Sequence, residues 1–176
     1  MMGIAFSAAG ADVDEQRLAH EKPKSMVLRL ASAKASAAHS DATQLVIGAD
    51  TIVTVDDEVF GKPLHEDDAL RMLAALSGRT HAVLTGVAVR SPLGVQTSLS
   101  STEVRFREIR PDEALAYWQS GEPRDKAGAY AIQGRGGVFV QAISGSYSGV
   151  VGLPVFETAR LLKNAGLDPI LMPLSS

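Results

Sequence analysis

A run of apolar, β-branched residues with a carboxylate inside it constrains the fold of this chain more than any other sequence feature. The segment VIGADT (46–51) leads directly into IVTV (52–55). Such a run predicts a buried strand. A carboxylate in a buried strand is costly unless a cation, hydrogen bonds or a metal compensates it. Asp50 is therefore either a structural acid with local partners or a reacting group held on a rigid element.

Strand and helix patterns alternate along the rest of the chain. Proline and acidic residues at helix starts and glycine or asparagine at helix ends support the helices. We expect strands at 3–9, 44–55, 59–60, 80–90, 95–109 and 138–143, and helices at 23–39, 65–76, 111–120 and 154–164. This alternation predicts an α/β fold with a mixed, twisted sheet flanked by helices. We expect two lobes around a central cleft within a single domain covering 1–176.

Composition excludes several classes of protein. A hydrophobic content of 45% supports a core, and the net charge of −3 gives no attraction to a nucleic acid polymer. The absence of cysteine excludes disulfides, thiolate zinc sites and thiol catalysis. The sequence shows no leader segment and no membrane-spanning stretch. We therefore expect a cytoplasmic protein without membrane or nucleic acid partners.

Five motifs occur in order and cover nearly the whole chain: IGADT (47–51), GKP (61–63), LSGRTHAVLTGVAV (76–89), GEPRDKAGAYAIQG (121–134) and GSYSGVVGLP (145–154). Together they resemble those of the Maf family of nucleotide pyrophosphatases. These enzymes cut a nucleoside triphosphate into the monophosphate and pyrophosphate. The AYAIQG and GSYSGVVGLP segments are similar to the branch that prefers dTTP and UTP. The resemblance implies a fold of the Maf and inosine-triphosphatase type, and a homodimer.

Hydrolysis of a triphosphate needs cations to offset its charge and a positioned water or metal hydroxide. The resemblance implies that Asp50 is the catalytic general base or metal-bound acid, and that Thr51 and Gln133 select a pyrimidine base. It also implies a divalent metal, Mg²⁺ with Mn²⁺ as the alternative, on Asp50 and Glu15. Mg²⁺ takes carboxylate oxygens and keeps several waters. The remaining candidate substrate-binding residues are charged: Lys34, Lys62, Asp125, Lys126 and, again, Glu15.

Each assignment has a structural alternative. Lys62 also fits a solvated turn, Glu15 also fits plain turn acidity, and Lys34 also fits a lysine whose stem lies along an apolar helix face. Gln133 precedes GRGG (134–137), which a glycine-rich hairpin turn explains equally well. The pair Tyr117-Trp118 is interpreted as core.

The phosphate-binding loop that is typical of the family is not found before the strand pattern at 3–9. Maf proteins normally begin with a strand and a phosphate-holding loop of the S-x-S-P-R-R type, and the chain as given starts after that point. We therefore expect a chain that is truncated at its N-terminus relative to the family and that turns over triphosphate poorly. The alternative function is a nucleotide-binding regulator without turnover, because the family has also been connected with septum formation and cell division.

Overall fold

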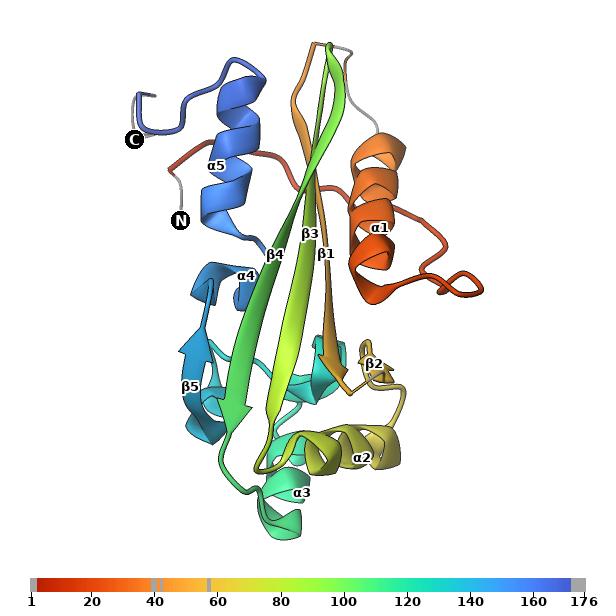
Figure 1. Cartoon of the computed structure of the whole chain (residues 1–176), viewed down its shortest axis with the longest axis vertical. Helices are drawn as coiled ribbons and strands as arrows, with labels where there is room; N and C mark the ends of the chain where they lie inside the picture. Colours follow the sequence, from red (N-terminus) through yellow and green to blue (C-terminus); the bar gives the residue numbers. More distant parts are fainter. Residues whose placement is uncertain (1–2, 39–40, 42, 57, 172–176) are drawn as a thin grey trace. The chain divides into compact units, whose positions relative to one another are not determined.

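The computed structural model describes residues 3–38, 41, 43–56 and 58–171. Within them, the strands form one sheet in the order β2-β1-β3-β4-β5. Their bounds are β1 Val46–Val55, β2 Glu58–Phe60, β3 Thr80–Ser91, β4 Gly94–Phe106 and β5 Val140–Ser144. Neighbouring strands run antiparallel (Figure 1). The α/β class and the helix-flanked sheet are thus confirmed, with antiparallel pairing throughout in place of a mixed arrangement.

Helices precede β1, lie between β2 and β3 and between β4 and β5, and follow β5. The α-helices are α1 Pro23–Ala37, α2 Glu66–Leu76, α3 Pro111–Gln119, α4 Tyr147–Val151 and α5 Val155–Asn164. Three 3₁₀ helices follow α3: η1 Glu122–Asp125, η2 Ala127–Ala129 and η3 Arg135–Phe139. The predicted end of the first helix at His39 lies outside the described residues.

The strand predicted at 3–9 is wrong. Its residues have no regular secondary structure, and Phe6 is 87% exposed. Ile4 packs instead beside Val87 and Leu161. An apolar alternation shows that one side of a segment can be buried, but not that a neighbouring strand offers it an edge. The last predicted strand also starts later, at Val140, because the preceding residues form η3.

The chain divides into two compact units. Unit 1 comprises residues 1–50, 85–100 and 153–176, and unit 2 comprises residues 51–84 and 101–152. Strands β1, β3 and β4 each contribute residues to both units. The predicted cleft and the assignment of a single domain stay predictions.

In unit 1, α1 and α5 cover opposite faces of the strands (Figure 1). Side chains alternate along β3, so Ala88 packs with Ala31 and Ala35 of α1, whereas Val87 and Val89 pack with α5. Helix α1 lies very close to the sheet. A Cβ atom added at Gly48 of β1 would lie 2.3 Å from the backbone oxygen of Ala31. The missing side chain at this position therefore permits the close approach.

Unit 2 has its own core, which is rich in aromatic rings. Its fully or nearly fully buried members include Phe60, Leu73, Leu76, Val104, Phe106 and Phe139. Tyr117 is 6% exposed and belongs to this core, with Trp118 packed against it. The interpretation of Tyr117-Trp118 as core is therefore consistent with the structure.

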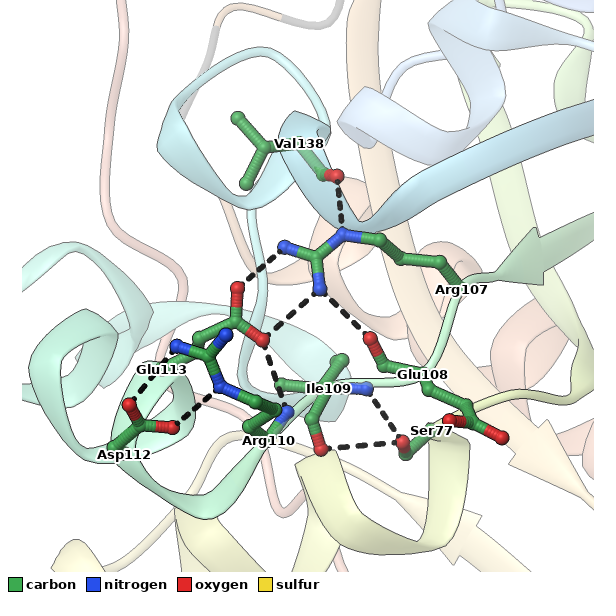
Figure 2. Close-up of polar contacts among 8 residues, drawn as sticks. All are labelled: Ser77, Arg107, Glu108, Ile109, Arg110, Asp112, Glu113 and Val138. Carbon is green, nitrogen blue, oxygen red and sulfur yellow. Dashed lines mark hydrogen bonds and ion pairs between the residues drawn. The ribbon is translucent and has the colours of Figure 1, made fainter.

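A polar network connects the end of β4 with α3 and with the end of η3 (Figure 2). The Arg107 guanidinium donates two hydrogen bonds to the Glu113 carboxylate, at 3.0 and 2.9 Å, and a third from Nε to the Val138 carbonyl at 3.2 Å. Its carbon Cζ lies 5.2 Å from the centre of the Phe139 ring. Planar, bidentate arginine–carboxylate pairs are geometrically specific. Arg107 therefore fixes the C-terminal end of η3.

Candidate active site

Asp50 lies on β1 with its side chain 8% exposed. It follows Gly48 by two residues, so both face α1. Lys34, in the last turn of α1, places its Nζ 2.7 Å from Asp50 Oδ1. The buried carboxylate predicted from the sequence is therefore compensated by a cation from the neighbouring helix. The narrow packing at Gly48 allows α1 to lie near enough for this contact.

Lys34 also contacts a second carboxylate. Its Nζ lies 2.6 Å from Glu15 Oε1, and the Glu15 side chain is 52% exposed whereas that of Lys34 is 22% exposed. Burial by itself lowers the pKa of Lys34, but hydrogen bonds to Asp50 and Glu15 and their charges raise it above its usual value. Lys34 is thus an ammonium ion at neutral pH, and it bridges two carboxylates from different segments.

A cavity of about 320 Å³ lies beside this cluster, entirely within unit 1. Glu15 and Lys34 contribute its charged groups, and the backbone of Gly48 and Ala49 brings β1 to its wall. Ile47, which is 40% exposed, and alanines at 9, 11 and 38 complete the lining. A cavity with a few convergent charged groups is the usual form of a small-molecule site. The Glu15–Lys34–Asp50 cluster is therefore the best candidate for chemistry.

Three other predicted residues come together in unit 2. Lys126 Nζ donates to Asp125 Oδ1 at 2.6 Å. This hydrogen bond lowers the pKa of Asp125 below its usual value, and the positive charges of Lys126 and Lys62 lower it further. The backbone N–H of Gly128 donates to the Gly61 carbonyl at 3.0 Å, which ties the turn carrying Lys62 to this loop. The GKP and GEPRDK motifs are thus spatial neighbours.

The two predicted base-selecting residues also belong to unit 2. Thr51 follows Asp50 on β1 and so faces the other side of the strand. A Cβ atom at Gly152 would lie 3.7 Å from Thr51 Oγ1, which places Thr51 beside the GSYSGVVGLP segment. Gln133 is exposed in the turn before η3. The roles of both residues stay predictions.

Sequence reasoning missed Glu122. Its Oε1 accepts hydrogen bonds from the Tyr117 hydroxyl at 2.7 Å and from the Gly136 N–H at 3.0 Å, and its Oε2 accepts from the Arg135 N–H at 3.0 Å. Two of the three donors are backbone N–H groups, which every non-proline residue carries, so no sequence pattern indicates these hydrogen bonds. The only signal was a carboxylate that precedes a glycine-rich loop by about a dozen residues.

The metal-binding capacity of the cluster rests on two carboxylates. Across the described ranges, no group of three or more histidine, aspartate, glutamate or cysteine side chains could hold a metal ion. Mg²⁺ often uses only one or two carboxylates and takes its remaining ligands from phosphates and water. Asp50 and Glu15, which are held near each other by Lys34, offer two such oxygen donors, and their role as metal ligands stays a prediction. In the part of the chain that the structure describes, no helix is both long and apolar enough to cross a bilayer.

Comparison with known proteins gives a consistent set of relatives. The family described as Maf-like protein matches residues 1–165. A dTTP/UTP pyrophosphatase of Methylobacillus flagellatus is 47% identical over 169 residues, which cover 94% of this chain and 85% of that protein. Proteins of the same name from Methylococcus capsulatus and Anaeromyxobacter dehalogenans are 49% and 52% identical, each over 94% of this chain and over 83% and 86% of their own lengths.

Proposed function

The chain belongs to the Maf-like family, and we propose that it is a nucleoside triphosphate pyrophosphatase that hydrolyses dTTP and UTP to the monophosphate and pyrophosphate. The observation that supports this most directly is the Glu15–Lys34–Asp50 cluster beside a cavity. It occurs in a chain that is 46–52% identical to relatives named for this activity. Modified pyrimidine triphosphates are further proposed substrates.

The proposed reaction needs a carboxylate and concentrated positive charge. Asp50 either ligates the metal or takes the proton of the attacking water, and its place on a buried strand keeps the carboxylate fixed. Lys34 holds the carboxylate in place and supplies charge that offsets the phosphates. We assign triphosphate binding to Lys62 and Lys126 as well. Asp125 positions Lys126 through their 2.6 Å hydrogen bond.

The proposed cofactor is Mg²⁺, with Mn²⁺ as the alternative, held by Asp50 and Glu15. When bound, such an ion polarises phosphoryl oxygens and lowers the pKa of bound water. Gln133 and Thr51 are proposed to select the base. A glutamine amide both donates and accepts hydrogen bonds, so it can pair with O4 and N3–H of uracil or thymine. Cytosine presents a donor at the position of O4 and should be a poorer substrate.

The test is pyrophosphate release from dTTP and UTP with Mg²⁺ by the protein and by Asp50→Asn. Loss of a general base or metal ligand commonly lowers turnover about 10²–10⁴-fold. Asp168→Asn is the matched control, because Asp168 also pairs with a lysine in unit 1, at 2.9 Å, but does not belong to the Glu15–Lys34–Asp50 cluster. Folding of each variant is checked by circular dichroism. Near-normal activity of a folded Asp50→Asn protein would remove Asp50 from the mechanism.

The same protein samples distinguish the enzyme from the alternative, a nucleotide-binding regulator without turnover. Calorimetric binding of UTP without pyrophosphate release would favour a nucleotide-binding regulator, and release of pyrophosphate would exclude it. The homodimer, the cytoplasmic location and the single domain stay predictions from the sequence.

A further inference from the structure

We infer that Glu122 is a positioning residue that holds the turn carrying Gln133 and thereby sets the preference for uracil or thymine over cytosine. The inference rests on the proposed function, because it assigns Glu122 a role through the proposed base-selecting residue. All of its evidence lies within unit 2, between Arg107 and Phe139.

The Glu122 carboxylate uses both of its oxygens. Oε1 accepts from the Tyr117 hydroxyl and the Gly136 N–H, and Oε2 accepts from the Arg135 N–H, at 2.7 to 3.0 Å. The Tyr117 hydroxyl accepts in turn from the Ala131 N–H at 3.0 Å. The backbone is thus tied on both sides of Gln133, two residues before it and two and three residues after it.

Two glycines let the turn close over this carboxylate. A Cβ atom at Gly134 would lie 2.3 Å from Glu122 Oε2, and one at Gly136 would lie 2.5 Å from the Tyr117 hydroxyl. The glycine at 134 therefore permits the close approach of the backbone to the carboxylate.

The other end of η3 is fixed independently. Arg107 donates to the Val138 carbonyl at 3.2 Å and is itself held by Glu113 (Figure 2). The 3₁₀ helix after Gln133 is therefore attached at its start by Glu122 and at its end by Arg107. Gln133 itself is exposed, so its direction depends on the backbone to which it is attached.

The charge of Glu122 is part of this arrangement. Burial raises the pKa of the carboxyl, but the hydrogen bonds from Tyr117 and from the two backbone N–H groups lower it below its usual value overall. Glu122 is consequently ionised at neutral pH and accepts on both oxygens. A glutamine at this position keeps one acceptor but places an NH₂ donor against a backbone donor.

The experiment compares kcat and KM for UTP and CTP in Glu122→Gln, Gln133→Ala and the double variant. We expect each single change to lower the ratio of kcat/KM for UTP to that for CTP by about 10-fold, and the double variant to lower it no further. Gly134→Ala retains the Glu122 carboxylate but displaces it, and should give the same loss. Glu103→Gln, an exposed carboxylate of unit 2, is the control and should leave the ratio unchanged.

A second measurement needs no turnover. Hydrogen exchange at the Arg135 and Gly136 amides should be about 10-fold faster in Glu122→Gln, because their acceptor is weakened or lost. Unchanged exchange at these two amides would show that Glu122 does not hold the turn, whether or not the protein hydrolyses UTP. An equal fall in kcat/KM for both nucleotides, additive with Gln133→Ala, would show a merely structural role and overturn the inference alone. An unchanged ratio in Gln133→Ala would overturn the base-selecting role and this inference with it.

Discussion

At the scale of single residues, the charge pattern around Asp50 is the most informative result. A carboxylate within an apolar strand required a compensating group, and the structure supplies Lys34 at 2.7 Å. The same ammonium lies 2.6 Å from Glu15. Two carboxylates held this close repel each other once the cation between them is removed. Lys34 therefore keeps the two acids together, and in the proposed function it also supplies charge for the anionic substrate.

Lys34→Met tests this role. We expect kcat/KM for UTP to fall about 10²-fold, because an electrostatic donor is lost and the two carboxylates separate. Lys163→Met is the matched control in unit 1, since Lys163 also forms an ion pair but is 70% exposed. Exposed pairs contribute little, so this control should behave as the unchanged protein. Equal kinetics for Lys34→Met and Lys163→Met would contradict the proposed role.

Some site residues could be predicted from the sequence and others could not, and the difference has a physical reason. Asp50 was recognisable because a buried carboxylate conflicts with its apolar neighbours. Glu122 was not, because two of its hydrogen-bond donors are the backbone N–H groups of Arg135 and Gly136, which every non-proline residue carries. The contact of Lys34 with Glu15 depends on the path of the irregular segment before α1, which no periodic pattern describes.

At the scale of secondary-structure elements, the packing of α1 on β1 places the catalytic candidates. Gly48 lies where a Cβ atom would meet the Ala31 oxygen at 2.3 Å and the Ala35 nitrogen at 2.5 Å. Both neighbours are backbone atoms of a helix and cannot turn aside. Lys34 lies between these two residues in the chain. Any displacement of α1 from the strand therefore moves the Lys34 ammonium relative to Asp50.

Gly48→Ala should thus affect both stability and activity. Overpacking of a close contact costs about 1–3 kcal/mol, and the displaced helix should weaken the Lys34–Asp50 hydrogen bond. We expect a lower Tm in thermal denaturation and a lower kcat/KM for UTP. Gly10→Ala is the control, because a Cβ atom there would meet nothing within 4 Å. A Gly48→Ala protein with unchanged Tm would show that α1 can shift without cost.

The elements themselves were predicted with uneven success. Long segments such as α2 and β3 were recognised, because α2 buries residues at helical spacing and β3 is a nearly continuous buried run. The segment at 3–9 has a strand-like alternation but forms no strand, since pairing depends on a partner distant in the sequence. The same argument explains the sheet: a pattern of strands and helices permits parallel or antiparallel neighbours, and only the chain path decides between them.

At the scale of the whole molecule, each unit has its own hydrophobic cluster. The cluster of unit 1 joins Val87 and Val89 to Leu161 and Leu162, whereas that of unit 2 contains most of the buried aromatic rings. The α/β class was predictable because it depends on the sum of many local patterns. Two lobes were also expected, but the boundaries of the two units were not predictable, because β1, β3 and β4 each read as one continuous strand yet belong to both units.

The unit 2 core also gives the whole protein a pH dependence of stability. His81 is 3% exposed and lies edge-on to Phe106, with 4.8 Å between the ring centres. Its Nε2 lies 2.9 Å from the Tyr130 hydroxyl, whereas Nδ1 has no hydrogen-bond partner among the described residues. Burial therefore lowers the pKa of His81 from 6.5 to about 4. Protonation would create a buried cation with an unpaired N–H.

The sign of the effect follows from proton binding. Between pH 6.5 and about 4 the unfolded chain protonates His81 and the folded protein does not, so the free energy of unfolding falls as the pH falls through this window. The full loss is about 3 kcal/mol. The carboxyls of Glu21 and Glu113, whose pKa values are lowered to about 2 by hydrogen bonds from arginines, lose their contributions only below pH 4.5. Stability should therefore be level from pH 6.5 to 8 and fall in two successive stages below pH 6.5.

Urea denaturation from pH 4.5 to 8 measures the upper stage. His81→Phe should remove most of the slope between pH 6.5 and 4.5, although it costs a pH-independent amount because the Tyr130 hydroxyl loses its partner. The slope, and not the absolute stability, is thus the diagnostic quantity. His20→Asn is the control: His20 is exposed at a φ of 60°, and asparagine tolerates that conformation. An unchanged slope in His81→Phe would show that another group causes the acid sensitivity.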